Sequence, residues 1–517
     1  MYLTQALHKA AREKPMAIAS VFQGRRTTFA ELITRVAKLA GALQALDVKP
    51  GDRVGMLALN SDRYLEYLYG SFWAGAVINP VNTRWNLLEI AYSLNDCQTQ
   101  VLLVDGTFKH LIPPLRQHCP CLRSVIYCGD GEPTADLLDY EALLNNTQPI
   151  ADALRCGKDL AAVLYTGGTT GTPKGVMLSH NALVSNALSA LAAAPRPLID
   201  TTLHVAPLFH VGALAAVLQG ALRGATHIIL SQFDSTAVLR AIAEEGVNET
   251  FLVPTMIQRI LDDPAFTEYD LSSLRNIIYG AAPMDPALLH RALHALPGSE
   301  FMQIYGMTEL GPVTAALPAY YHTFEGQKLH KLKAAGRPAP NCEVRIVDPE
   351  GNELPKGRSG EVVVRSSSVM LGYWNKPEET AQALRDGWMH TGDGGYLDED
   401  GFLYIVDRIK DMIVSGGENI YSNEVENAIL SHPDVRMCAV IGIPDEQWGE
   451  SVHAVIVLQE GKHLDSEHIK QHCKSLIAGY KCPRSIEFRE ELPLSAAGKL
   501  LKYVLREPFW GTQTRRI

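Results

Sequence analysis

Several kinds of segment are missing from this 517-residue chain, and each absence excludes a class of protein. No run of about 18 apolar residues occurs, so the sequence predicts no membrane-spanning helix. The first fifteen residues mix Leu3, Leu7 and Ala10 with charged side chains, which indicates an amphipathic surface helix and not a signal peptide. No internal repeat or low-complexity linker stands out, so the chain does not read as a repeat array.

Cysteine is sparse, and basic residues are outnumbered. The nine cysteines are odd in number and irregularly spaced, which fits a chain kept reduced in the cytoplasm. His118-Cys119-Pro120-Cys121 faintly resembles a metal site, but it has no second pair, and an ordinary structural role is favoured. The net charge of −10 argues against general affinity for nucleic acid. We expect a cytoplasmic protein without a nucleic-acid partner.

The length and the order of apolar segments predict several domains of α/β type. A chain of this length is too long for one ordinary core. Short apolar strands alternate with helical patterns, as in the strand over 54–59 and the helices over 64–75 and 177–192, the last capped by Ser179 or Asn181. This alternation predicts sheets with helices on their faces, and a β-rich stretch follows residue 336.

A charged break, Asp407-Arg408-Ile409-Lys410-Asp411, separates apolar strands expected over 403–406 and 412–414. It is the best domain boundary in the sequence. We therefore expect one domain over 1–407 and another over 408–517.

The segment Tyr165–Gly175, Y-T-G-G-T-T-G-T-P-K-G, is the most informative stretch. An apolar run over 160–164 leads into it and predicts a buried strand. Glycines let the backbone approach an anion closely, threonine hydroxyls donate hydrogen bonds, and Lys174 adds a positive charge. No G-x-x-x-x-G-K-[ST] pattern occurs, so this is not a Walker loop, yet its chemistry suits a triphosphate.

A second motif, Tyr305-Gly306-Met307-Thr308-Glu309, follows an expected strand further along the chain. Tyr305 can stack on a base, Thr308 can donate to a phosphate, and Glu309 is a hard oxygen ligand suited to Mg²⁺. The pattern is weak alone and gains weight from the loop before it.

Together these motifs resemble the signatures of the adenylate-forming superfamily, which includes acyl-CoA synthetases, peptide-synthetase adenylation domains and firefly luciferase. The resemblance covers nearly the whole chain. One departure is the run T-G-G-T-T-G where the family most often has T-S-G-T-T-G, so hydroxyls would come from Thr166, Thr169 and Thr170. The resemblance implies an α/β fold with a large N-terminal domain of layered sheets, a β-rich subdomain and a small mobile α+β C-terminal domain.

The resemblance also implies a role for each matching position. The residues that would bind ATP are Thr166, Gly167, Gly168, Thr169, Thr170, Gly171, Lys174, Gly280, Ala281, Ala282, Pro283, Tyr305, Gly306, Thr308, Asp393, Arg408 and Lys499. The residues that would contact coenzyme A are Gly417, Trp448, Tyr480 and Arg484. The residues that would line the acyl pocket are His210, Val211, Gly212, Gly306, Met307, Gly311 and Pro312. The residues that would serve catalysis are Lys499, Glu309, Thr308, Lys174 and His210, with Glu309 holding Mg²⁺ and Lys410 acting as the hinge.

The acid to be activated is the open question. Small residues beside Met307 and Val211 fit an apolar tail, and the absence of aspartate from 205–212 disfavours an amino acid. We expect an AMP-forming acyl-CoA synthetase for a medium- or long-chain fatty acid, with an aryl acid of the benzoate type as the alternative.

Two further classes stay open. An adenylation enzyme could load a carrier-protein thiol, although Tyr480 and Arg484 weigh against it. A non-catalytic binding protein is disfavoured because the charged residues of the motifs are all retained. A homodimer and a peripheral membrane contact are both compatible with the resemblance.

Overall fold

The computed structural model describes residues 2–166, 173–193, 200–282, 284–328, 330–408, 411–415, 418–445, 447–494 and 500–510. The chain divides into two compact units, one of residues 1–343 and 364–389, the other of residues 344–363 and 390–517. The division passes through strands β17 (Cys342–Val347), β18 (Gly360–Ser366) and β21 (Trp388–Leu397).

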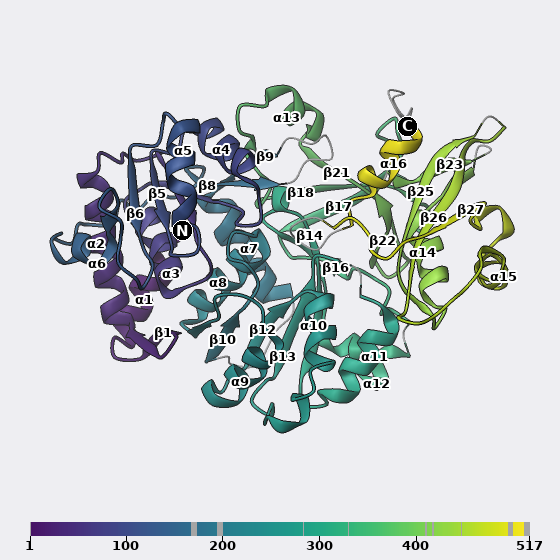
Figure 1. Ribbon diagram of the computed structural model, residues 1–517, viewed down its shortest axis with the longest axis horizontal. Coiled ribbons are helices and arrows are strands. Elements are labelled where there is room, and N and C mark those ends of the chain that lie inside the picture. The colour runs from purple at the N-terminus through teal and green to yellow at the C-terminus, as the bar shows by residue number, and fades with distance from the viewer. Residues whose placement is uncertain are drawn as a thin grey trace. The chain divides into compact units, whose positions relative to one another are not determined.

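The first unit is built on two large sheets (Figure 1). Over the described residues, one has nine strands in the order β16-β15-β14-β13-β12-β10-β11-β1-β2, and the other has eight in the order β19-β9-β8-β4-β3-β5-β6-β7. The strands of the nine-stranded sheet are β1 Ile18–Phe22, β2 Arg25–Thr28, β10 Thr201–His204, β11 Thr226–Ile229, β12 Glu249–Leu252, β13 Asn276–Gly280, β14 Glu300–Gly306, β15 Val313–Leu317 and β16 Arg337–Pro338. Those of the eight-stranded sheet are β3 Arg53–Leu57, β4 Val77–Pro80, β5 Val101–Val104, β6 Ser124–Tyr127, β7 Leu138–Asp139, β8 Leu160–Thr166, β9 Lys174–Ser179 and β19 Gly372–Tyr373.

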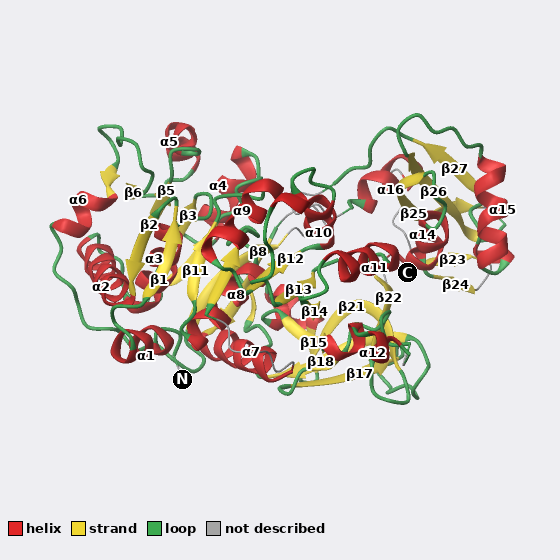
Figure 2. Ribbon diagram, turned by 90° about the horizontal axis from the view of Figure 1, so that it is seen from below, coloured by secondary structure: helices red, strands yellow, loops and turns green. Residues whose placement is uncertain are grey.

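Helices separate and cover these sheets (Figure 2). Helix α3 (Asp62–Trp73) contacts β1 of one sheet and β3 and β4 of the other, which explains why all of its residues are buried. Helix α2 (Phe29–Ala45) packs on α3 and begins at Thr28, whose hydroxyl accepts a hydrogen bond from the backbone N–H of Glu31. The remaining helices of the unit are α1 Gln5–Glu13, α4 Leu87–Asp96, α5 Ile112–His118, α6 Tyr140–Asn145, α7 His180–Ala193, α8 Val211–Arg223, α9 Ser235–Glu245, α10 Pro254–Leu261, α11 Pro286–Ala295, α12 Phe324–Gln327 and α13 Pro377–Ala383.

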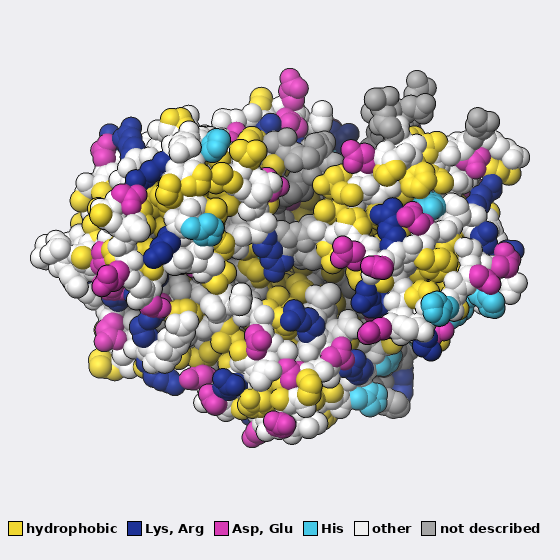
Figure 3. All heavy atoms as spheres, in the orientation of Figure 1, with side chains coloured by type: hydrophobic (Ala, Val, Ile, Leu, Met, Phe, Trp, Pro, Cys, Tyr) yellow, Lys and Arg dark blue, Asp and Glu magenta, His cyan; other side chains and the backbone are white. Residues whose placement is uncertain are grey.

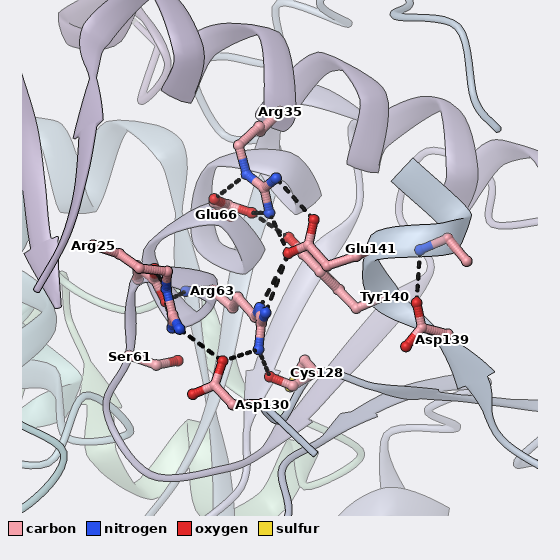
Figure 4. A network of polar contacts seen from close by, with 12 residues as sticks. Arg25, Arg35, Ser61, Arg63, Glu66, Cys128, Asp130, Asp139, Tyr140 and Glu141 are labelled. Carbon is pink, nitrogen blue, oxygen red and sulfur yellow. Dashed lines mark hydrogen bonds and ion pairs between the residues drawn. The ribbon is translucent and has the colours of Figure 1, made fainter. Parts of the chain in front are cut away.

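Two charged residues that α3 buries, Arg63 and Glu66, are paired with residues of neighbouring segments (Figure 4). Arg35 of α2 donates to both Glu66 of α3 (2.6 Å) and Glu141 of α6 (2.7 Å). Arg63 of α3 donates to Asp130 at 3.0 Å, and the hydroxyl of Tyr140 donates to Glu66 at 2.6 Å. A buried charge is costly unless it is paired, so this network fixes the three helices relative to one another.

The second unit contains a β-rich part and a separate small sheet. In the β-rich part the strand order is β17-β18-β21-β20, with β20 at Leu384–Arg385 and with β22 (Leu403–Arg408) also paired to β21. The small sheet has the order β24-β23-β26-β25 with β27 beside β26. Its strands are β23 Ile413–Ser415, β24 Glu418–Ile420, β25 Val435–Asp445, β26 Gly449–Leu458 and β27 Ser485–Phe488.

Helices cover both faces of the small sheet. Along β25, Cys438 and Val440 join the core under α14 (Ser422–Leu430) and α15 (Ser466–Leu476). Ala439 and Ile441 face the opposite way, into the core that includes Leu505 of α16 (Lys502–Trp510). This alternation is the two-residue period of a strand buried on both faces.

The structure corrects several expected boundaries. The strand expected over 54–59 is β3 at Arg53–Leu57, and the helix expected over 64–75 is α3 at Asp62–Trp73. The helix expected over 177–192 begins only at His180, because residues 174–179 form β9, which pairs antiparallel with β8. The cap is Ser179, whose hydroxyl accepts from the backbone N–H of Ala182 at 3.0 Å. The strand expected over 403–406 extends to Arg408, so the first two residues of the charged break belong to β22.

The surface carries mixed charge. On the face that Figure 3 draws, acidic, basic and apolar side chains are interspersed. In the described part of the chain, no helix combines the length and the hydrophobicity needed to cross a membrane.

Candidate functional site

Four neighbouring strands of the nine-stranded sheet end at a common edge that carries many of the expected site residues. Strands β10, β12, β13 and β14 are parallel, so their carboxyl ends lie together. In open α/β sheets, ligands bind at this edge. The segments that leave it contain His210, Ala281 and Thr308.

His210 lies at the start of α8, where it is the residue before the first turn. Its ring centroid is 4.3 Å from that of Phe209. Two residues later, a Cβ added to Gly212 would lie 3.3 Å from the ring of Phe251, which stands near the end of β12. Gly212, which was expected in the acyl pocket, therefore lies against an aromatic side chain that the sequence did not predict. No local motif marks Phe251, because its contact with the site of Gly212 depends on packing between distant segments.

The end of β13 approaches the neighbouring strand closely. A Cβ added to Gly280 would overlap the carbonyl oxygen of Ile304 in β14, so glycine is required there. Ala281 follows with φ 65°, in the left-handed region. Of the small residues expected here, Gly280 thus has a steric reason.

A buried polar cluster begins at Tyr279, the residue before Gly280. The hydroxyl of Tyr279 is 3.2 Å from Oε1 of Gln303 and 2.9 Å from Nε2 of His322. Burial lowers the pKa of His322 to about 4. Gln303 is two residues before Tyr305 on β14 and faces the same side of the strand.

The second motif forms a turn between β14 and β15. A Cβ on Gly306 would overlap the carbonyl oxygen of Pro312, and Gly311 has φ 79° before a cis peptide bond to Pro312. Thr308 and Glu309 lie in a short 3-10 turn over Thr308–Leu310, and Glu309 is buried. Its carboxylate accepts a hydrogen bond from the hydroxyl of Tyr373 at 2.9 Å.

The Gly/Thr-rich segment begins in β8 and ends in β9. Strands β8 and β9 pair antiparallel up to Thr166 and Lys174, which face each other across the base of the loop. The ammonium nitrogen of Lys174 is 5.1 Å from the centroid of the Tyr373 ring. The loop base and the second motif therefore meet at one tyrosine from β19, which the sequence reasoning missed.

In the second unit, two expected nucleotide ligands stand opposite each other. Asp393 of β21 pairs in register with Arg408 of β22. Asp393 is buried, and its backbone N–H donates to the hydroxyl of Thr391 at 3.1 Å.

The expected coenzyme A contacts also partly converge. The guanidinium carbon of Arg484 is 4.6 Å from the Trp448 ring centroid, a cation–π geometry. Tyr480 is 48% exposed, and its ring lies 5.7 Å from the ammonium nitrogen of Lys481. Trp448 and Arg484 thus lie together, whereas the ring contact described for Tyr480 is with Lys481.

Several expected site residues lie outside the described part of the chain. They are Gly167, Gly168, Thr169, Thr170, Gly171, Pro283, Lys410, Gly417 and Lys499. Within the described residues, no group of three or more histidine, cysteine, aspartate and glutamate side chains comes together as a metal site.

The sequence matches the AMP-binding enzyme family over residues 7–374 and the AMP-binding enzyme C-terminal domain over residues 424–499. The chain therefore belongs to the AMP-binding enzyme family, and the resemblance predicted from its motifs is confirmed. The expected fold class is also confirmed, with a large N-terminal and a smaller C-terminal domain of α/β type.

Three proteins similar to this chain are named for different acids. A feruloyl-CoA synthase from Amycolatopsis sp is 41% identical over 97% of this chain and 98% of its own length. A fatty acid–[acyl-carrier-protein] ligase, ScoC, from Streptomyces coeruleorubidus is 35% identical over 100% and 98%. The solved o-succinylbenzoate CoA synthetase from Bacillus subtilis, in complex with its acyl-adenylate intermediate, has a TM-score of 0.85 at 30% identity and covers 97% of each chain.

These findings establish the general activity. The protein is an AMP-forming acid–CoA ligase that uses ATP and coenzyme A with a small-molecule carboxylic acid.

Proposed function

We propose that the acid carries an aromatic ring and that the enzyme is an aryl-CoA ligase. The observation that carries this proposal is the feruloyl-CoA synthase, which is 41% identical to this chain, against 35% for the fatty-acid ligase ScoC. The rings of Phe251 and Phe209 beside Gly212 and His210 support it. Aromatic pairs add about 0.5–1.5 kcal/mol beyond the area that they bury. The fatty acid expected from the sequence becomes the second candidate, which the similarity to ScoC favours.

In the first half-reaction, a carboxylate oxygen attacks the α-phosphorus of ATP, and pyrophosphate leaves. The Gly/Thr-rich segment after Thr166 would hold the phosphates, with Lys174 at its base. Lys499 would stabilise the charge that develops between the carboxylate and the α-phosphate. Tyr305 would stack on adenine, and Asp393 would bind the ribose hydroxyls.

The donor set fits a magnesium ion bound through the nucleotide. Glu309 is a buried carboxylate with one oxygen fixed by Tyr373. Mg²⁺ in nucleotide sites needs only one or two protein carboxylates beside the substrate phosphates. When bound, the ion would neutralise phosphate charge.

In the second half-reaction, the thiol of coenzyme A attacks the acyl carbonyl and AMP leaves. His210 would gate the acyl pocket, and Gly417 would leave room for the pantetheine chain. Arg484, stacked on Trp448, and Tyr480 would hold the nucleotide end of coenzyme A. The domain that begins at residue 408 would rotate about Lys410 between the two steps.

Pyrophosphate release tests this proposal directly. The enzyme is incubated with ATP, Mg²⁺ and one acid at a time from ferulate, benzoate, decanoate and palmitate, with and without coenzyme A. Thioester is followed by mass spectrometry. We expect a value of kcat/KM for the ring-bearing acids at least about tenfold above that for the alkyl acids, since pocket contacts of this kind are worth about 1–3 kcal/mol.

Each other outcome would lead to a different assignment. Preference for decanoate or palmitate would establish the fatty-acid ligase instead. Pyrophosphate release without thioester would move the acceptor from coenzyme A to a carrier protein.

A further inference from the structure

Tyr373 stands where three segments of the first unit meet. It belongs to β19, which pairs antiparallel with β9 so that Tyr373 faces Val176. The backbone N–H of Trp374 donates to the carbonyl of Gly175 at 2.7 Å. The backbone N–H of Met370 donates to the carbonyl of Glu309 at 2.8 Å. The segment around Tyr373 is thus hydrogen-bonded both to the base of the phosphate loop and to the second motif.

The Tyr373 side chain touches a charged group at each of these segments. Its hydroxyl donates to Oε1 of Glu309 at 2.9 Å. Its ring centroid lies 5.1 Å from the ammonium nitrogen of Lys174. Its own backbone N–H is held by the hydroxyl of Thr380 at 2.9 Å. One anchored tyrosine therefore contacts both the carboxylate that would hold Mg²⁺ and the ammonium that would lie beside the phosphates.

We propose that Tyr373 is a positioning residue for adenylation, which fixes Glu309 through its hydroxyl and Lys174 through its ring before ATP binds. A hydrogen bond to a charged acceptor is stronger than one between neutral groups, so it holds the carboxylate in one orientation. An ammonium over an aromatic face is held more weakly and can still move onto a phosphate. The proposal rests on the proposed role of Glu309.

The Tyr373→Phe variant separates the two contacts, because it keeps the ring and removes the hydroxyl. The readout is binding of Mn²⁺, as a probe for Mg²⁺, in the presence of α,β-methylene-ATP, followed by the electron paramagnetic resonance of free Mn²⁺. Loss of an outer-shell partner of a metal ligand weakens metal binding by about 10- to 100-fold, and we expect a change in this range. Tyr92→Phe is the matched control, a half-buried tyrosine whose ring contacts Tyr165, and it should bind Mn²⁺ as the native enzyme does.

A second measurement separates positioning from general damage to the fold. The rate of acyl-adenylate formation should fall in Tyr373→Phe, while transfer of the acyl group from supplied acyl-adenylate to coenzyme A should keep its native rate. Native Mn²⁺ affinity in Tyr373→Phe, or equal loss of both half-reactions, would overturn the proposal.

The Glu309→Gln variant distinguishes a failure of the role proposed for Tyr373 from a failure of the metal assignment of Glu309. If Glu309→Gln weakens Mn²⁺ binding and Tyr373→Phe does not, only the role of Tyr373 is wrong. If Glu309→Gln binds Mn²⁺ as tightly as the native enzyme, the metal assignment of Glu309 fails, and the role of Tyr373 fails with it.

Discussion

His204 and His227 form a fully buried pair on β10 and β11, with Nε2 of the first 2.8 Å from Nδ1 of the second. Burial, the neighbouring histidine and Arg223 of α8 lower the pKa of His204, while burial and Arg223 lower that of His227 to about 4. Arg223 is itself paired with Glu249 of β12. The unfolded chain binds a proton near pH 6.5 and the folded pair does not, so the stability that this pair contributes is present above pH 6.5 and is lost as the pH falls toward 4.

The expected size of this effect follows from the lowered pKa of His227. The contribution of His227 to the free energy of unfolding should fall by about 2 kcal/mol between pH 7 and pH 5. Denaturant unfolding of the native protein and of His227→Leu at both pH values measures it, because the variant should lose that part of the dependence. Equal pH dependence in the two proteins would contradict the prediction.

Gly306 is a second residue whose identity is dictated by geometry. A Cβ there would overlap the carbonyl oxygen of Pro312, a backbone atom that cannot rotate away. Gly306→Ala should therefore displace the turn that carries Glu309, destabilise the protein by at least about 2 kcal/mol and abolish adenylation. The control is Gly298→Ala, since a Cβ at this exposed glycine meets nothing within 4 Å. If the Gly306→Ala variant has the same melting temperature and turnover rate as the Gly298→Ala variant, the steric argument is wrong.

The site residues that the sequence predicted differ in one physical respect from those that it did not predict. Glu309 and Lys174 stand inside local motifs, where residue type and spacing carry the chemistry. Tyr373 and Phe251 gain their contacts only through strand pairing and packing between segments far apart in the chain. No local pattern marks such partners, so a single sequence could not reveal them.

Among the elements, helix α16 follows directly after the segment that carries Lys499 and is fixed by buried charge. The ammonium of Lys502 lies 2.8 Å from a carboxylate oxygen of Glu426 on α14 and donates to the hydroxyl of Ser422. That hydroxyl donates in turn to Asp407 at 2.7 Å. Burial opposes the charge on Lys502, but Glu426 and Asp407 outweigh it and raise its pKa.

Removal of Lys502 should be costly, because Glu426 would remain buried without its cationic partner and with only the backbone N–H of Val440 beside it. Lys502→Met is expected to lower the free energy of unfolding by about 3–5 kcal/mol. Glu426→Gln in the same chain should restore part of the loss, and thermal melts of the single and double variants measure both. If the double variant is as unstable as the sum of the single variants, the two side chains are not coupled.

Helix and strand boundaries were harder to predict than their existence. Residues 177–179 were expected in a helix because a short apolar run looks alike in either state. The hydrogen bonds of β9 to β8 and β19 show that these residues form a strand. The strand β22 runs into the charged break for the same reason, since pairing of Arg408 with Asp393 extends it.

At the scale of the whole molecule, the α/β architecture was predictable and the division into compact units was not. Alternating strands and helices already predicted layered sheets. The two compact units divide within β17, β18 and β21, whose strands look continuous in the sequence. The domain boundary at residue 408 stays a prediction, which the separation of the two half-reactions can test.

The proposed rotation requires that two residues of one small domain serve different steps. Lys499→Ala should slow acyl-adenylate formation by about 10²- to 10³-fold, the usual cost of one lost group that stabilises transition-state charge. Transfer from supplied acyl-adenylate to coenzyme A should stay near its native rate. Gly417→Leu should do the reverse, because a branched side chain would obstruct the pantetheine chain while leaving the first step intact. Rapid-quench measurement of each half-reaction gives the four rates.

The pattern of these four rates discriminates between a rotating and a fixed domain. Lys462→Ala serves as the control, because this lysine of the same unit is exposed and pairs only with a surface carboxylate, Asp434, at 3.0 Å among the contacts described. It should leave both steps unchanged. If Lys499→Ala and Gly417→Leu each slow both steps equally, the two residues act in one arrangement of the site, and no rotation about Lys410 is needed. Opposite selectivity instead requires that the domain present a different face to the acyl-adenylate in each step.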